Sequence, residues 1–321
     1  MKKFASAVLL TLVATSSFAA PAVKECIAPA GPGGGWDFTC RSVSKLLFDE
    51  KLVPSQIQTV NMAGAGGGVA FAHVVSKRKK DNSVFIAAST ATTTRLAQGQ
   101  FKGMNADMVK WVAAIGAEYG VIAVKKDSPY HTLTELMDAL KKEPSAVKFA
   151  GASSVGGWDH LKVLMAAQEA GIQNAKDIRY LSFNNGGDAI TKVLGGHLDA
   201  FTGDISEAQG FIQSGDLRVL AVLADERLPA PYDHIPTAKE QGVNTTAANW
   251  RGFYLPKDVS DDTYNWWVAT LDKLSDDPKW QAVMAQNGLM PFHKSGADFT
   301  DYVNSQIADI QAISKSLGII Q

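Results

Sequence analysis

The sequence predicts an α/β protein folded as two lobes with a ligand cleft between them. Short β-like runs alternate with helical patterns along most of the chain, which is typical of largely parallel sheets covered by helices. Two stretches break this alternation: 124–132 contains a proline turn, and 224–236 has three prolines and no periodicity. We therefore expect one lobe from 21–124 plus 230–321 and a second lobe from 125–229.

The first twenty residues have the pattern of a secretory signal peptide. A basic start at Lys2 and Lys3 precedes the apolar run FASAVLLTLVA, and the small residues of SSFAA offer a cleavage site. The run is too short for a transmembrane helix, and no later segment is apolar enough for one. Because Cys26 lies well downstream of the run, we expect a soluble exported protein and not a lipoprotein.

The expected strands and helices follow in order. Helical periodicity predicts a helix over 37–50, with Asp37 at its N-cap and Val43, Leu46 and Leu47 on one face. Strands are expected at 23–30, 57–62, 83–89, 109–116, 120–126, 147–152, 178–183, 197–204 and 217–225. Further helices are expected after 63, over 132–142, after 158 and 186, and in the amphipathic segments 261–275 and 297–318.

Length and charge set limits on the function. The 321 residues include 31 basic and 32 acidic ones, and removal of Lys2 and Lys3 would bring the net charge near −3. This balance gives no indication of a nucleic-acid partner. The one basic run, at 76–82, is more typical of a solvated helix end than of a binding patch.

The chain has two cysteines, Cys26 and Cys40. In an exported protein an even number favours a disulfide, which would brace the glycine-rich segment between the two residues. Two free or separately buried thiols are the alternative. Neither cysteine has a histidine or cysteine at metal-ligand spacing, so we expect no metal site. We expect no cofactor either.

The first candidate binding loop is AGPGGGWDF, residues 30–38, between a strand and a helix. Glycines leave backbone N–H groups open to an anion at a helix start, and an aromatic side chain supplies a wall. The candidate residues are Gly33, Gly34, Gly35, Trp36 and Asp37. A plain glycine-rich turn is the alternative.

Three more loops lie where the carboxyl ends of parallel strands are expected. AGAGGG at 63–68 fits neither a dinucleotide fingerprint nor a phosphate-binding P-loop, so tight packing is as good an explanation as ligand contact. ASTATTTR at 88–95 offers Ser89, Thr90, Thr92 and Thr93, with Arg95 behind them, either for a carboxylate or for helix capping. GASSVGGWDH at 151–160 repeats the Gly-Gly-Trp-Asp letters of the first loop and offers Ser153, Ser154 and Gly156.

No catalytic constellation is visible. GASSV lacks the G-x-S-x-G pattern, and the histidines show no H-x-x-x-H spacing. A Ser153–His160 pair in a secreted hydrolase remains a minor alternative. Asp204, at the end of an expected strand, is predicted either to accept from a ligand hydroxyl or to tie the lobes together, with a solvated carboxylate as the alternative.

The motifs together resemble the extracytoplasmic receptors of tripartite tricarboxylate transporters, also called the Bug family. The similar segments are APAGPGGGWDFTCR, NMAGAGGGVAFAHV, ASSVGGWDHL, GGDAITKVLGGHLDAFTGD, GDLRVLAVLADERLP, IPTAKEQGVN and NWRGFYLPKDV, which span nearly the whole mature chain. The first loop, with Trp36, Asp37 and Cys40, looks most like the tricarboxylate branch.

The resemblance implies a two-lobed periplasmic binding protein of the type II kind, not an enzyme, which closes over a carboxylate. It places the ligand on residues 33–37 and on Ser153, Ser154 and Gly156, and less firmly on Ser89–Thr93 and Asp204, often through water. It further implies a periplasmic monomer that delivers a di- or tricarboxylate, citrate in first place, to a membrane permease. A sensory protein that feeds a signalling receptor is the alternative partner assignment.

Overall fold

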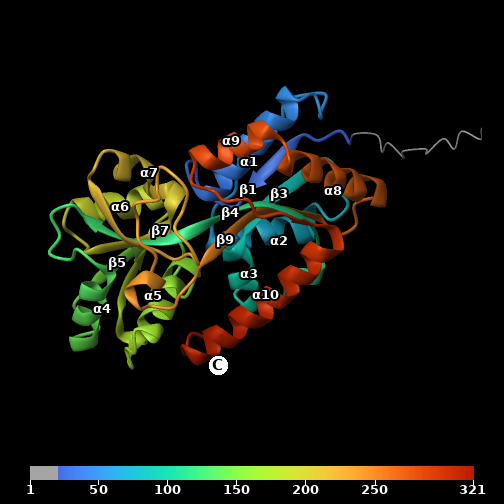
Figure 1. The fold of residues 1–321 in the computed structure, drawn as a ribbon. Helices are drawn as coiled ribbons and strands as arrows, with labels where there is room; N and C mark the ends of the chain where they lie inside the picture. The colour runs from blue at the N-terminus through green and yellow to red at the C-terminus, as the bar shows by residue number, and fades with distance from the viewer. Residues whose placement is uncertain (1–20) are drawn as a thin grey trace, which may run out of the picture.

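The computed structural model describes residues 21–321, so the predicted signal peptide lies outside the described part of the chain. Within that part, none of the helices combines the length and the apolar character that a membrane span requires. The α/β fold predicted from the alternation of elements is confirmed, and Figure 1 shows helices packed around strands in two lobes.

The strands of the described residues form one continuous path from lobe to lobe. Its order is β2 (Gln58–Asn61), β1 (Glu25–Ala28), β3 (Val84–Ser89), β9 (Ala248–Pro256), β4 (Val109–Lys125), β7 (Ala200–Asp204), β5 (Lys148–Gly151) and β6 (Arg179–Ser182). β8 (Leu217–Val222) and β10 (Lys294–Ser295) also pair with β4. Pairing is parallel in the outer groups β2-β1-β3 and β7-β5-β6, and antiparallel around β9 and β4.

β4 joins the two lobes. Its first part, 109–119, pairs with β9, and its last part, 120–125, pairs with β7 and β8. The prediction of two separate strands at 109–116 and 120–126 was therefore wrong. Gly116 and Gly120 resemble turn residues in the sequence, but here they let other groups pack close, because an added Cβ would meet Met284 Sδ at 2.9 Å or Lys162 Cδ at 2.8 Å.

Helices cover both parts of the sheet. In the lobe that contains β1, these are α1 (Gly35–Asp49), α2 (Gly68–Lys77), α3 (Thr90–Ala97), α8 (Asp261–Ser275), α9 (Pro278–Gln286) and α10 (Gly296–Ser316). In the other lobe they are α4 (Leu133–Lys142), α5 (Trp158–Glu169), α6 (Gly186–Leu194) and α7 (Ile205–Gln213). The predicted apolar face of α1 is confirmed, since Val43, Leu46 and Leu47 are buried.

We expected the chain to cross back to the first lobe near residue 230. The segment 230–247 does not return to the first lobe: Ala238 and Val243 pack in the core beneath α4 and α5, and Ala247 N donates to Leu223 O at 2.8 Å. Prolines mark the end of regular structure here, but apolar side chains keep the segment on the second lobe. We propose that the lobes divide near 119/120 and 247/248.

Cys26 and Cys40 form a disulfide that links β1 to α1. Both residues are fully buried in the first-lobe core. Of the two predictions left open, the bonded form is confirmed, and the bond encloses the first glycine loop between its two ends.

Candidate functional site

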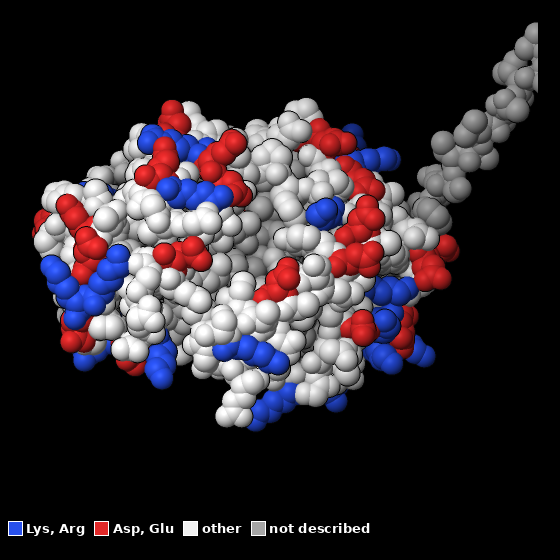
Figure 2. Space-filling view, turned by 60° about the horizontal axis from the view of Figure 1, so that its bottom comes forward, with Lys and Arg blue, Asp and Glu red and all other residues white. Residues whose placement is uncertain are grey.

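A cavity of about 600 Å³ lies between the lobes. Its wall comes from the loop after β1, the 63–67 loop, the start of α3, the loops that precede α5 and α6, and residues of β7, α7 and β9. In Figure 2 one face of the molecule is hollowed near its middle, and the visible lining is mostly uncharged. Lys/Arg and Asp/Glu are intermixed around it.

The first glycine loop presents the amino end of α1 to this cavity. Gly33 takes a φ of +81°, which favours glycine, and Gly34 is an N-cap without a side-chain hydrogen bond to the helix. Asp37 turns back to its own loop and accepts from Gly33 N at 3.0 Å. Gly34, Gly35 and Trp36 line the cavity, whereas Gly33 and Asp37 do not.

The hydroxyl loop is more structural than the sequence indicated. Ser89 lines the cavity, and its Oγ accepts from Trp36 Nε1 and from Ala91 N, both at 3.1 Å. Thr90, Thr92 and Thr93 are buried away from the wall. The Thr90 hydroxyl donates to Ala248 O, which links α3 to β9. The Thr93 hydroxyl donates to Thr90 O and the Thr92 hydroxyl accepts from Ser89 N, both within the start of α3.

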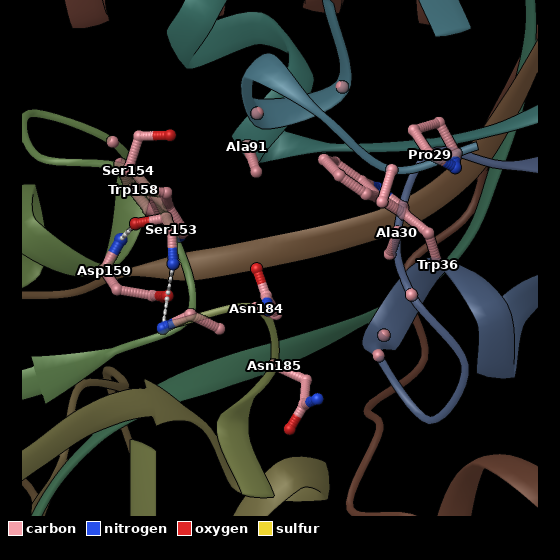
Figure 3. A pocket seen from close by; sticks show the side chains of 18 of the residues that line it. Pro29, Ala30, Trp36, Ala91, Ser153, Ser154, Trp158, Asp159, Asn184 and Asn185 are labelled. Atoms are coloured by element: carbon pink, nitrogen blue, oxygen red, sulfur yellow. Dashed lines mark hydrogen bonds between the residues drawn. The ribbon is translucent and has the colours of Figure 1, made fainter. Parts of the chain in front are cut away.

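The second-lobe loop places Ser153 and Ser154 on the opposite wall. In Figure 3, Ser153, Trp158 and Asp159 face Trp36 and Ala30 across the cavity. Ser153 N and Ala152 N donate to Asp159 Oδ2 at 2.8 and 3.1 Å, and Asp159 N donates to Ser153 Oγ at 2.9 Å. These bonds hold the loop against the amino end of α5.

Gly156 shapes this loop from outside the cavity. It has a φ of +77°, its N–H donates to His160 Nδ1 at 2.9 Å, and its carbonyl accepts from Gln98 Nε2 at 2.6 Å. His160 is buried, and burial lowers its pKa to about 4. Ser153 Oγ and His160 are each bonded to the loop backbone and not to one another. This geometry argues against the Ser/His hydrolase.

A buried ion network closes the base of the cavity and ties β7 to β9. Asp204 accepts from Lys162 Nζ at 2.5 Å, from Asn249 Nδ2 at 2.5 Å and from Arg251 Nη2 at 3.0 Å. Arg251 also pairs with Glu118, and Lys162 with Asp159 at 2.9 Å. Asp204 is therefore one of the cavity residues that tie the lobes together, as one of the sequence alternatives held.

The network controls the protonation of its members. Burial opposes charge on Asp204, but Lys162 and Arg251 outweigh it and lower the pKa of the carboxyl. Burial also opposes charge on Lys162, whose pKa is nevertheless raised by Asp159 and Asp204. These groups therefore stay ionised at neutral pH.

Arg95 is the cavity cation that forms no ion pair with another described residue. It lies half-buried, donates from Nη1 to Gln98 at 3.2 Å, and its Nε has no hydrogen-bond partner in the described chain. Burial lowers its pKa from the ordinary value. Its charge is thus available to a ligand in the cavity.

Sequence reasoning missed part of the wall. Glu207, Asn249 and the stretch 182–185 line the cavity, and Lys162 and Glu118 support it from behind. One signal was present, since SFNNGGD at 182–188 is a glycine-containing loop between a strand and a helix. The other residues lie inside elements, where nothing in the local sequence separates a cavity residue from a core residue. In the described residues, no group of three or more His, Cys, Asp or Glu is arranged to hold a metal ion.

The comparisons with known proteins identify the class. The profile of the family described as "Tripartite tricarboxylate transporter family receptor" matches residues 48–319, so the chain belongs to this family. Its members are solute-binding proteins and not enzymes. The resemblance noted in the sequence is therefore confirmed, as is the prediction of a binding protein without catalytic activity.

Individual relatives support the same class. The chain is 25% identical to Protein BugT of Bordetella pertussis, over 78% of this chain and 78% of the relative. The solved structure of R. palustris Rpa4515 with adipate has a TM-score of 0.83 at 20% identity, covering 92% of this chain and 97% of that one. MatC from Rhodopseudomonas palustris with bound malate has 0.78 at 19%, covering 91% and 98%. The predicted two-lobed fold of periplasmic binding proteins is confirmed.

Proposed function

We propose that this protein is a periplasmic receptor that captures a di- or tricarboxylate between its lobes and passes it to a membrane permease. The observation that carries the proposal is the cavity, which receives the amino ends of α1 and α5 from opposite lobes together with Arg95. Helix amino ends and an unpaired guanidinium both favour anions. Uncharged hydrogen-bond donors of both lobes would then bind the same ligand. Because these contacts form together only when the lobes approach one another, ligand binding favours the closed arrangement of the lobes.

Family membership and the cavity support the proposed ligand class. Adipate and malate, bound in the two solved relatives, are both dicarboxylates. The about 600 Å³ of the cavity also suffices for a tricarboxylate, and citrate stays our first candidate. Ser153 and Ser154 would donate to a carboxylate on one side, and Asn184 and Asn185 offer both donors and acceptors to a ligand hydroxyl.

The test is a thermal-shift panel on the mature protein with succinate, malate, adipate, tricarballylate and citrate, each with and without Mg²⁺. A ligand at about 100 times its Kd adds about 2.7 kcal/mol to the free energy of unfolding and raises the midpoint. Arg95→Gln should weaken binding by about tenfold or more, whereas Arg227→Gln, at an exposed ion pair with Glu240, should leave it unchanged. No shift with any carboxylate would contradict the proposal.

The downstream partner needs a separate test. We propose a permease because the family is that of transporter receptors. Uptake of the radiolabelled ligand should be lost when the gene is deleted and restored when it is returned. Normal uptake with loss of a transcriptional response to the ligand would instead support the sensory alternative. The ligand-bound protein should run as a monomer in size-exclusion chromatography.

A further inference from the structure

One charge cluster at the base of the cavity has more acids than bases. Four carboxylates and two cations meet there: Glu118, Asp159, Asp204, Glu207, Lys162 and Arg251. If all were ionised, the cluster would carry a net charge of −2. Such a surplus in a buried place is costly, and proteins commonly remove it by binding a proton.

The geometry shows which carboxylate lacks a cation. Lys162 forms ion pairs with Asp159 and Asp204, and Arg251 forms ion pairs with Glu118 and Asp204. Glu207 forms no ion pair with another described residue. Its oxygens accept only two long backbone bonds, from Gly186 N at 3.2 Å and from Asp204 N at 3.3 Å.

Glu207 also faces the cavity. It lies in the first turn of α7, is only partly buried and belongs to the cavity wall. A carboxyl that carries a proton at this place can therefore donate to an anion in the cavity.

We infer that Glu207 keeps its proton in the folded protein and presents a carboxylic acid O–H to an anion in the cavity, so that a carboxylate and a proton are bound together. The part that concerns the anion rests on the proposed function, while retention of the proton does not. The proton comes from solvent and no bond other than O–H is made or broken.

The surroundings set the pH range. Burial, and then Asp159, Asp204 and Glu118, raise the pKa of Glu207 to about 8. The charged or titratable groups around it on neighbouring elements are Glu118 (β4), Asp159 and Lys162 (α5), Tyr180 (β6), Asp204 (β7) and Arg251 (β9). Asp188 (α6) belongs to the same cavity wall. A bound anion adds negative charge and raises this pKa further, so binding should take up a proton and weaken as the pH rises above about 8.

The first arm uses the ligand-free mature protein. Because the pKa in the folded state exceeds the ordinary one of 4.5, the stabilisation is complete below pH 4.5 and is lost as the pH rises toward about 8. Glu207→Gln should therefore remove a one-proton slope, about tenfold in the unfolding equilibrium constant per pH unit, between about pH 5.5 and 7.5. Gln suits the same capping position. Glu135→Gln, the exposed glutamate of the capping box of α4, is the matched control and should keep the slope. Equal slopes in the wild type and Glu207→Gln would overturn the inference.

The second arm is calorimetry with the tightest carboxylate of the panel at about pH 9, in two buffers of different ionisation enthalpy. The wild type should take up about half a proton, and its affinity should fall about five- to tenfold from pH 7 to pH 9. Glu207→Gln should show neither effect. Proton release, as expected if an ionised Glu207 met a ligand ammonium group, or unchanged linkage in Glu207→Gln would overturn the inference. If no carboxylate binds, the proposed function fails, and the first arm still decides whether Glu207 holds the proton.

Discussion

The two loops that face each other across the cavity share the letters Gly-Gly-Trp-Asp, at 34–37 and at 156–159. In both, the aspartate turns back and accepts from the backbone of its own loop: Asp37 from Gly33 N, and Asp159 from Ser153 N. In both, a positive-φ glycine precedes the helix. The same residue types thus have the same local role in both loops: the aspartate holds a glycine turn in place at the start of a helix.

The loops differ in the burial of the cation that pairs with the aspartate. The partner of Asp37 is Arg41, whose side chain is 56% exposed, while that of Asp159 is Lys162, which is fully buried. Lys162 also forms an ion pair with Asp204, and Asp204 lies on β7, which pairs with β4, the strand that joins the lobes. The first loop is therefore fastened within its own lobe, and the second is connected to a buried network that spans both. It follows that burial, not the motif, decides how much a charge pair matters.

The largest effect is expected from Lys162→Met. Removal of this cation leaves Asp159 and Asp204 buried with less compensation, which costs about 3–5 kcal/mol in the free energy of unfolding at neutral pH. Urea unfolding measures the change. A loss below about 1 kcal/mol would mean that the two loops are equivalent after all.

Next in size is Gly35→Ala, a test of the first loop's contact with the network. An added Cβ would lie 2.7 Å from Arg251 Cζ, so the guanidinium must move and its bonds to Glu118 and Asp204 weaken. We expect carboxylate affinity to fall by about tenfold, measured by calorimetry. Gly210→Ala in α7 is the matched control, because its Cβ meets nothing within 4 Å and the residue does not line the cavity. Equal affinities of the two variants would count against the contact.

Asp37→Asn should have a moderate, pH-dependent effect. Burial opposes the charge, but bonds from Arg41, Gly33 and Asn61 outweigh it and lower the pKa of Asp37. The carboxylate therefore stabilises the fold above the ordinary pKa of 3.8 and loses this effect as the pH falls through its lowered value. The variant should lose about 1–2 kcal/mol at pH 7 and progressively less in acid, as followed by unfolding at about pH 2–7. A pH-independent loss would assign the effect to packing.

The smallest effect is expected from Arg41→Ala. The pair is exposed on the arginine side, and Asp37 keeps its bonds from Gly33 N and Asn61 Nδ2. We expect less than about 1 kcal/mol, which should shrink further at high salt. Thermal unfolding with and without about 0.5 M NaCl checks this. A loss comparable to that of Lys162→Met would contradict the contrast between the two loops.

Local features were predictable from the amino-acid sequence alone. Alternation of apolar runs defined most strands and helices, and the glycine loops defined two sides of the cavity, because these depend on neighbours in the chain. Gly34, Gly35, Trp36, Ser153 and Ser154, which we predicted as ligand residues, line the cavity wall. We did not predict α9, although Asp277 at its N-cap and Pro278 at its first position are typical of a helix start.

Features that depend on residues far apart in the sequence could not be predicted and became visible only in the tertiary structure. The continuous β4, the proposed return of the chain near 247/248 and the bond from Thr90 to Ala248 O depend on packing between elements far apart in sequence. In the sequence, Lys162 and Glu207 look like ordinary helix residues. In the fold, Lys162 is buried among carboxylates, and Glu207 lies on the cavity wall without a cation. Charge compensation depends on distances in space, and no pattern of neighbouring letters encodes those distances.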